Sequence, residues 1–427
     1  MTDPHIHIFD NNAYLFSGRD VDYNARDYTM KDWLVWSSSD LINWKLEYTL
    51  DPADTYIGSI DKCFATDAAE RNGKYYWYIS NYMSEIAVVE ATKPGGPFHD
   101  KQKKPLIPKG LTNCRQYDPT IFIDDDKSKT PYLFFGETWE NDYHIVKLNS
   151  DMVSLAEESR KIEIQGHYRI EDKNFVFKRN GIYYLVWGDT YAPADNVYVP
   201  YRIAGNFFGS RNSVFECHNQ WFMAVEDYFC TGCTPFFKGS SIHYLHFKSN
   251  GVPYVDPNNG YGVGEYDASR PIMQAENYFE ADAIDKVNDN VNGFYISPEK
   301  SGAWSIYPNI YGLSDNETIT FNVSSKTDQW TIEVYEENPH GKLLGSCKIP
   351  NTQRSLQLIN CKLSNTAEKQ NLCMVFVGKS DEKPLVDYFS YPAGKDIAKP
   401  DAYWDFKLNT QGWRTLDNQE IDFDDEK

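Results

Sequence analysis

The chain has 427 residues, more than one ordinary core holds, so two domains are expected. Its 62 acidic against 42 basic residues give a formal net charge of -20, which argues against nucleic acid or an anionic membrane as partner. No run of residues reaches the roughly 18 apolar positions of a membrane span. A neutral, soluble substrate fits this composition best.

The N-terminus gives one expectation about location. Met1 is followed at once by a strand-like run rather than by a signal peptide. The chain is therefore either cytoplasmic or begins where a signal was removed. We expect the second, a secreted or periplasmic protein whose signal peptide is not part of this sequence.

Short aromatic strands dominate the first 250 residues or so, and helical periodicity is nearly absent. A polar turn followed by an aromatic strand recurs about every 40 to 60 residues, as repeat architectures do. The copies are Asn11–Ser17, Asn72–Tyr78, Lys129–Phe135, Asn180–Trp187 and a weaker Asn219–Ala224. Asn-Gly tolerates positive φ at both turn positions, so these copies are read as hairpins. The pattern predicts an all-β fold, with a five-bladed β-propeller over residues 1–268.

The strand before each hairpin turn begins with a polar residue and then becomes apolar. The leading residues are Asp3, Asp67, Asp118, Glu171 and, near the fifth strand, Arg211. The innermost strands of a propeller line its axis, so these residues are expected to meet at one face. Four acids would then surround one cavity.

Carboxylates that repel one another are not gathered for stability. Glycoside hydrolysis needs such a set, with one carboxylic acid to protonate the leaving oxygen and one carboxylate to activate water. A third carboxylate near the acid raises its pKa. Asp3, Asp118 and Glu171 are therefore the candidate catalytic residues, whereas Asp67 is expected to be structural.

Several motifs resemble glycoside hydrolase family 43, over roughly residues 1–265. They are Asp3–Ile6, Met30–Trp33, Ser39–Trp44, Tyr117–Asp126, Asn149–Met152, Glu171–Asn174 and Lys178–Gly181. The resemblance implies an inverting mechanism without a catalytic cofactor. It also implies roles for three residues: Asp3 as general base, Asp118 as the residue that tunes and orients the acid, and Glu171 as general acid.

Two positions depart from the family pattern. Arg211 stands where a histidine usually supports a central metal or water network, so a central calcium is doubtful, and Arg211 is expected to bind an acid or a sugar hydroxyl. Phe64 replaces the usual tryptophan before the second-blade acid. Trp139 and Trp187 are further candidates for substrate binding, with strand packing as the alternative.

After Gly264 the hairpin repeat gives way to alternating strands, which predict a β-sandwich, a jelly roll, over residues 269–394. The opening and closing motifs, Gln274–Phe279 and Leu385–Ser390, resemble carbohydrate-binding modules of family 6. By that resemblance a structural calcium would be held by Glu276, Glu280 and Asp387. Tyr295 and Trp304 are candidate sugar platforms, and a purely structural role for the module stays open.

The remaining features leave alternatives open. Residues 395–427 are read as a C-terminal extension or the truncated start of a further module. Cys230-x-x-Cys233 is a zinc half-site without a second close pair, so loose or buried thiols are favoured. Pairing of Cys347 with Cys361 is not decided by the sequence.

The resemblance favours an exo-acting, inverting α-L-arabinofuranosidase whose partner is plant cell-wall carbohydrate, with neither nucleic acid nor a membrane span. Within the same family, a β-xylosidase or an arabinan- or galactan-cleaving enzyme is the alternative. From another class, the alternative is a non-catalytic carbohydrate-binding propeller, which the acids at positions 3, 118 and 171 argue against.

Overall fold

The computed structural model describes residues 1–21, 24–137, 143–166, 171–206, 209–227, 234–255, 263–264, 266–267, 272–289, 293–313 and 318–391. Within these ranges the chain is all-β, and its one helix is a 3-10 turn, Pro52–Asp54. No helix in the described ranges is long and apolar enough to cross a bilayer. Residues 1–215 with 222–243 form one compact unit, and residues 216–221 with the described residues from Tyr244 onward form the other.

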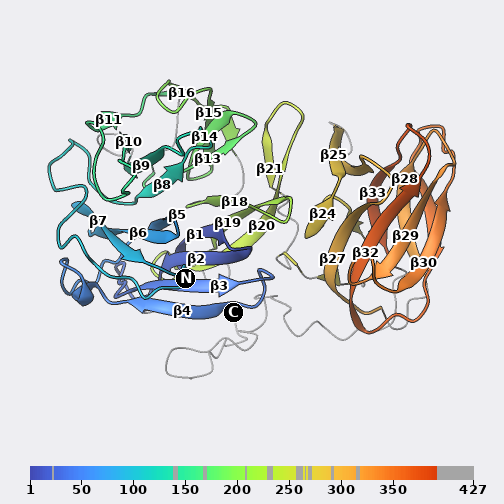
Figure 1. Ribbon diagram of the computed structural model, residues 1–427, viewed down its shortest axis with the longest axis horizontal. Helices are drawn as coiled ribbons and strands as arrows, with labels where there is room; N and C mark the ends of the chain where they lie inside the picture. The colour runs from blue at the N-terminus through green and yellow to red at the C-terminus, as the bar shows by residue number, and fades with distance from the viewer. Residues whose placement is uncertain are drawn as a thin grey trace, which may run out of the picture. The chain divides into compact units, whose positions relative to one another are not determined.

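Five antiparallel sheets follow one another from the N-terminus (Figure 1). The first contains β1 (Thr2–Phe9), β2 (Asn12–Gly18), β3 (Trp33–Ser38) and β4 (Lys45–Leu50) in that order. The second contains β5 (Asp67–Arg71), β6 (Lys74–Asn81) and β7 (Glu85–Ala91). The third contains β8 (Thr120–Ile123), β9 (Pro131–Gly136), β10 (Tyr143–Lys147) and β11 (Arg160–Lys161).

The fourth and fifth sheets repeat this meander. The fourth contains β13 (Asn174–Arg179), β14 (Ile182–Trp187), β15 (Thr190–Ala194) and β17 (Gly205–Asn206). The short strands β12 (Ile164–Gln165) and β16 (Tyr201–Arg202) pair in parallel beside it. The fifth contains β18 (Ser213–Cys217), β19 (Gln220–Asp227), β20 (Gly239–Phe247) and β21 (Pro253–Val255). The division between the two compact units falls within this fifth sheet.

The predicted Asn-Gly hairpins are present. Asn72 and Gly73 both have positive φ, 54° and 73°, and join β5 to β6 in the register Arg71↔Lys74. Asn180 and Gly181 do the same between β13 and β14, with φ of 50° and 81°. Positive φ at both turn positions is what a two-residue hairpin with the right-handed strand twist requires.

Apolar side chains fill the space between successive sheets. Consecutive residues of a strand point to opposite faces, so each sheet contributes to two cores. On β9, Phe135 packs with Tyr78 of the second sheet, whereas Phe134 packs with Trp187 of the fourth. Each middle sheet is thus covered on both faces, and its strands are apolar almost throughout.

The first strands of the five sheets lie against one another. Pairs β1 and β5, β5 and β8, and β8 and β13 are in contact. The backbone N–H of Ile6 on β1 donates to Ser213 Oγ on β18 at 3.0 Å. Thr120 Oγ1 on β8 donates to the carbonyl of Asn174 on β13 at 2.7 Å. The leading ends of these strands are therefore gathered in one place.

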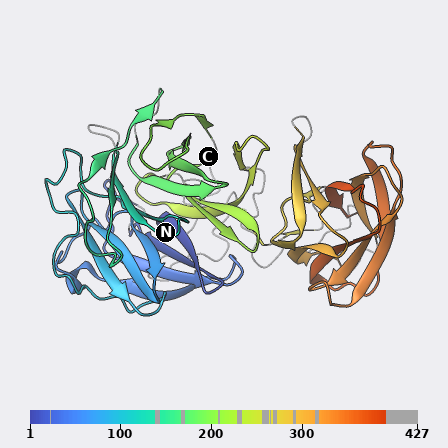
Figure 2. The ribbon, with the colours of Figure 1, turned by 45° about the horizontal axis from the view of Figure 1, so that its top comes forward.

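The C-terminal unit has two six-stranded sheets, which Figure 2 shows in a second orientation. One contains β22 (Tyr266–Asp267), β24 (Glu280–Asp282), β27 (Ala303–Tyr311), β29 (Trp330–Glu336), β30 (Leu343–Ile349) and β32 (Lys369–Gly378). The other contains β23 (Met273–Gln274), β25 (Ile284–Asp289), β26 (Gly293–Pro298), β28 (Thr318–Ser324), β31 (Gln357–Lys362) and β33 (Leu385–Ser390). Tyr307 of the first packs edge-on against Phe389 of the second, 4.8 Å between ring centroids, so the sheets share a core.

The cysteine alternatives are settled only in part. Cys347 on β30 and Cys361 on β31 are buried free thiols. Cys230 and Cys233 lie outside the described residues, as does the whole segment 395–427.

Candidate active site

The leading residues of three inner strands share an unusual backbone conformation. Asp3, Asp118 and Arg211 have φ of 51°, 50° and 51°, in the left-handed region. This region costs a non-glycine residue about 1–3 kcal/mol, and such residues persist where the surroundings over-determine them. The same distortion at three topologically equivalent positions aims their side chains at a common centre.

Arg211 occupies that centre. It lies two residues before β18, the first strand of the fifth sheet, and its side chain is only 17% exposed. Its nitrogens approach four carboxylates: NH1 lies 3.1 Å from Asp3 Oδ1, NH2 lies 2.8 Å from Asp172 Oδ1 and 4.0 Å from Glu171 Oε1, and Nε lies 3.2 Å from Glu226 Oε2. One guanidinium therefore lies between the candidate base and the candidate acid, whereas the sequence predicted only that Arg211 binds an acid or a sugar hydroxyl.

This bridge limits the separation of the two candidate catalytic carboxylates. Both contact terminal nitrogens of one planar guanidinium, at 3.1 Å for Asp3 and 4.0 Å for Glu171. Their contacting oxygens are thus at most about 9.5 Å apart, a bound that admits the 6.5–9.5 Å of an inverting pair.

Asp118 lies deeper, 1% exposed. Its backbone N–H donates to Ser80 Oγ at 3.1 Å, and its Oδ2 accepts from the backbone N–H of Lys173 at 3.2 Å. Burial, and then the charges of Asp172 and Asp3, raise the pKa of Asp118 well above its usual range. The folded site therefore favours Asp118 in its neutral form.

The two bridged carboxyls are driven in opposite directions. Burial by itself would raise the pKa of Asp3, but the charges of Arg211, Lys173 and Lys238 outweigh it and lower the pKa to about 2. Burial and the charge of Asp172 raise the pKa of Glu171 to about 7. Between these values Asp3 is ionised while Glu171 is protonated, which is the state that a general base and a general acid require.

The residue that raises the pKa of the acid differs from the sequence expectation. That role was assigned to Asp118, but the largest electrostatic contribution comes from Asp172, beside Glu171 in the chain. A neutral Asp118 carries no charge with which to act on Glu171. The sequence contained a signal for Asp172, because it directly follows the candidate acid Glu171. It contained no such signal for Glu226, which is buried on β19 and also contacts Arg211. An orienting role for Asp118 stays a prediction.

A central metal ion does not fit this arrangement. Besides Arg211, the centre holds the side chains of Lys173 and Lys238, 1% and 4% exposed. Lys238 Nζ lies 3.4 Å from Asp20 Oδ2 and 3.8 Å from Glu226 Oε1. These fixed cations already face the carboxylates that a divalent ion would need, and they would repel it.

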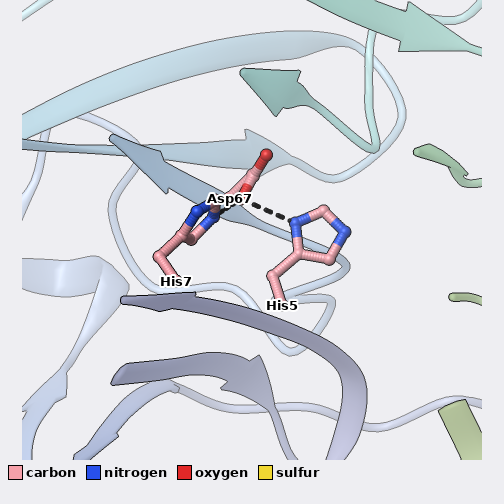
Figure 3. Close-up of side chains that lie close together, drawn as sticks. All are labelled: His5, His7 and Asp67. Carbon is pink, nitrogen blue, oxygen red and sulfur yellow. Dashed lines mark hydrogen bonds and ion pairs between the residues drawn. The ribbon is translucent and has the colours of Figure 1, made fainter. Parts of the chain in front are cut away.

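His5, His7 and Asp67 form a separate polar cluster (Figure 3). Asp67 Oδ1 lies 2.8 Å from His5 Nδ1 and 2.5 Å from His7 Nε2. Among the described residues, these three form the one group of possible metal ligands whose ligand atoms all lie within 4.8 Å of one another. Asp67 also accepts the backbone N–H of Ala68 and of Ile121, both at 2.8 Å. Its oxygens are therefore engaged in joining β1, β5 and β8, which is a structural role.

An aromatic pair lies close to Asp118. The ring of Phe64, half-buried, is 5.7 Å from that of Tyr82, which is 47% exposed. Ser80, whose Oγ accepts from the N–H of Asp118, donates to the carbonyl of Ala65 at 3.4 Å, so the chain next to Phe64 and the chain two residues before Tyr82 are both tied to the start of β8. Open aromatic faces suit the apolar faces of sugars. Sequence reasoning named Phe64 and did not name Tyr82; a sugar-binding role for Phe64 stays a prediction.

Of the two tryptophans proposed for substrate binding, the structure describes only Trp187. Trp187 is 1% exposed and packs edge-on against Tyr143, with ring centroids 6.1 Å apart. Its ring has no free face for a sugar, so strand packing, the alternative, is what the structure supports. Trp139 lies outside the described residues.

The C-terminal candidates are not gathered into one site. Asp387 Oδ2 accepts from Asn322 Nδ2 at 3.1 Å, Glu276 is buried and Glu280 is half-exposed. They do not form a group of three ligands in the described part of the chain. The calcium stays a prediction. Of the two platform candidates, Tyr295 is buried and Trp304 is half-buried.

Comparison with known proteins finds a family match in each of the two parts of the chain. Residues 1–212 match the sequence profile of Glycosyl hydrolases family 43, and residues 274–391 match that of Carbohydrate binding module (family 6). This is the order of domains that the motifs indicated.

Curated relatives extend the match along the chain. An arabinoxylan arabinofuranohydrolase of Bacillus subtilis (strain 168) is 24% identical over 455 residues, covering 88% of this chain and 87% of the relative. One of the same name from Paenibacillus polymyxa is 22% identical, covering 88% and 70%. A xylosidase/arabinosidase of Bacteroides ovatus is 24% identical, covering 53% and 86%.

Among solved structures, a family 43 arabinoxylan arabinofuranohydrolase from Bacillus subtilis in complex with cellotetraose aligns with a TM-score of 0.52. The alignment covers 91% of this chain and 95% of that one at 20% sequence identity. At this identity the likeness concerns the fold alone.

Proposed function

Because residues 1–212 form a family 43 glycoside hydrolase domain and residues 274–391 a family 6 carbohydrate-binding module, we propose that the chain is an exo-acting, inverting α-L-arabinofuranosidase of plant cell-wall polysaccharides or oligosaccharides. The arabinose rests on the relatives: two are named arabinoxylan arabinofuranohydrolases, and both match 88% of this chain. The reaction class rests on the site itself.

The observation that carries the proposal is the position of Arg211 between Asp3 and Glu171, together with the opposite shifts of their pKa values: Asp3 is lowered, first by the charge of Arg211, and Glu171 is raised by burial and the charge of Asp172. In the proposed reaction Glu171 gives its proton to the glycosidic oxygen as the bond to the anomeric carbon breaks. Asp3 takes a proton from a water molecule, which attacks the same carbon from the opposite face. The sugar leaves with inverted configuration, and proton exchange with solvent restores both carboxyls.

The arrangement of the sheets supports a fold proposal for each of the two units. We infer that the five successive sheets close into a five-bladed β-propeller over residues 1–268, since β1, β5, β8 and β13 touch in sequence and the backbone N–H of Ile6 on β1 donates to Ser213 Oγ on β18. The two C-terminal sheets would form a jelly roll over residues 269–394, followed by the extension 395–427. A polymer outside the cell as substrate also favours a secreted or periplasmic enzyme.

A β-xylosidase is the second candidate, because one relative is named xylosidase/arabinosidase. Both sugars are neutral. The pair of Phe64 and Tyr82 offers a face to either sugar ring. Release of arabinose and of xylose must therefore be measured side by side.

The test is hydrolysis of 4-nitrophenyl α-L-arabinofuranoside and β-D-xyloside by the wild type, by Asp3→Asn and by the control Asp195→Asn, which alters an exposed acid. We expect the arabinoside to be preferred, and Asp3→Asn to lose about 10²–10⁴-fold in kcat. NMR of freshly released sugar should show inversion. Retention, or an Asp3→Asn enzyme as fast as the wild type, would overturn the mechanism; no hydrolysis of any glycoside would favour a sugar-binding propeller.

A further inference from the structure

Asp172 is the acid beside Glu171 for which the catalytic scheme has no task. We propose that Asp172 is a positioning residue: its carboxylate anchors the guanidinium of Arg211 so that the guanidinium spans Asp3 and Glu171. This inference rests on the proposed function, because it assigns Asp172 an effect on the acid and base named there.

The geometry of the anchor is specific. Arg211 NH2 donates a hydrogen bond to Asp172 Oδ2 at 3.0 Å, and Oδ1 lies 2.8 Å from the same nitrogen as an ion-pair contact. The same nitrogen is 4.0 Å from Glu171 Oε1, too far for a hydrogen bond. Asp172 therefore takes the close contact with the cation and leaves Glu171 beside it.

The rest of Arg211 is held from the other side. NH1 bonds to Asp3 at 3.1 Å, and Nε lies 3.2 Å from Glu226, whose side chain is fully buried. A guanidinium with all its nitrogens directed at fixed carboxylates has one orientation. Removing Asp172 would free only the end of Arg211 that faces Glu171.

The backbone around Asp172 is also fixed. Tyr143 on β10 donates its hydroxyl to the carbonyls of Asp172 and Glu171, at 2.5 and 3.2 Å. Gly188, with φ of 50°, lies against Glu171 so closely that a Cβ there would be 3.5 Å from Oε2. The backbone of both acids is thus held by one hydroxyl, and the side chain of Glu171 lies beside Gly188.

Other charged or titratable groups surround this pair. Asp118 and Asp3 face it from the inner strands, with Tyr117 beside Asp118. The buried Lys173 Nζ lies 3.5 Å from the carbonyl of Arg211. None of these is adjacent to Glu171 in the chain, so Asp172 is the group whose removal alters the surroundings of Glu171 most directly.

Two effects of Asp172→Asn act in the same direction. The like charge beside Glu171 disappears, and Arg211, no longer held by the carboxylate of Asp172, is free to approach Glu171. Each favours the ionised form of Glu171, so the pKa of the acid falls. The alkaline limb of the kcat/KM profile reports the acid in the free enzyme.

The experiment is the pH profile of kcat/KM for an aryl arabinofuranoside with the wild type, Asp172→Asn, Asp172→Glu and the exposed control Asp195→Asn. We expect Asp172→Asn to move the alkaline limb to lower pH by about one unit or more. Asp172→Glu, which restores the carboxylate, should return the limb toward the wild type. The control should superimpose on it.

Two pH profiles of Asp172→Asn would contradict the proposed role of Asp172. An Asp172→Asn profile lowered equally at every pH would give Asp172 a merely structural role and overturn the proposal, as would an unchanged profile. If the wild type hydrolyses no glycoside, the proposed function fails separately. The inference is then decided by ¹³C-carboxyl NMR titration of Glu171, identified by the signal lost in Glu171→Gln: a lower pKa in Asp172→Asn supports it, and an equal pKa refutes it.

Discussion

Replacing Glu171 by glutamine is expected to stabilise the protein above about pH 4.5, and most at neutral and alkaline pH. Burial and the charge of Asp172 raise the pKa of this carboxyl from 4.5 to about 7. A group whose pKa rises on folding binds its proton more tightly in the folded state. Its ionisation therefore penalises folding as the pH rises from about 4.5 through about 7. Below this window the penalty is absent.

The magnitude follows from the shift. Each pKa unit corresponds to about 1.4 kcal/mol. The unfolding free energy of Glu171→Gln minus that of the wild type should therefore be about 3 kcal/mol larger at pH 8 than at pH 4. With its side chain only 14% exposed, Glu171 is little screened by solvent. Asp3 titrates in both proteins, so its contribution cancels in the difference.

The assay is guanidinium unfolding followed by tryptophan fluorescence at pH 4, 5, 6, 7 and 8. The exposed control Glu158→Gln, in the same unit, should track the wild type throughout. Because the chain has two units, the transition of the N-terminal unit must be identified, and a core variant such as Trp187→Ala does this. Parallel stability curves for Glu171→Gln and wild type would refute the reasoning, since Glu171 would then have the same pKa folded and unfolded.

Two further predictions separate surface aromatics from core aromatics. Tyr82→Ala should raise KM for an arabinoxylan oligosaccharide about three- to tenfold, because one stacking ring is lost, while the unfolding free energy changes by less than about 0.5 kcal/mol; an unchanged KM would remove Tyr82 from the substrate path. Trp187→Ala should lower the unfolding free energy by about 3–5 kcal/mol because it empties a core position, and KM of the folded fraction should stay constant; a raised KM at unchanged stability would restore Trp187 as a sugar-binding residue.

The sequence was most informative where structure is local. Asn72-Gly73 and Asn180-Gly181 predicted hairpins because both positions must adopt positive φ, and no distant contact is needed to impose that. The acids at the strand starts were found because a repeat places equivalent residues at equivalent positions. Asp3 and Glu171 indeed meet at Arg211.

The electrostatics of the site depend on contacts that the sequence does not contain. Arg211 reaches Asp3 across 208 residues, and nothing near either residue announces the pair. Whether a carboxyl is charged depends on how deeply it is buried, and the sequence does not contain that depth. Asp118 was therefore expected to act on Glu171 through its charge, whereas burial favours its neutral form. The aromatic strands misled for a related reason: in a sheet covered on both faces, Trp187 has no solvent side.

The left-handed backbone at positions 3, 118 and 211 has a consequence for the directed evolution of this protein. Glycine adopts that conformation without steric cost, so replacing any of the three relieves strain while deleting a side chain of the site. A library screened only for heat resistance or expression would therefore accumulate glycine at these positions and yield stable but inactive proteins. Selection for thermostability must be coupled at every round to sugar release.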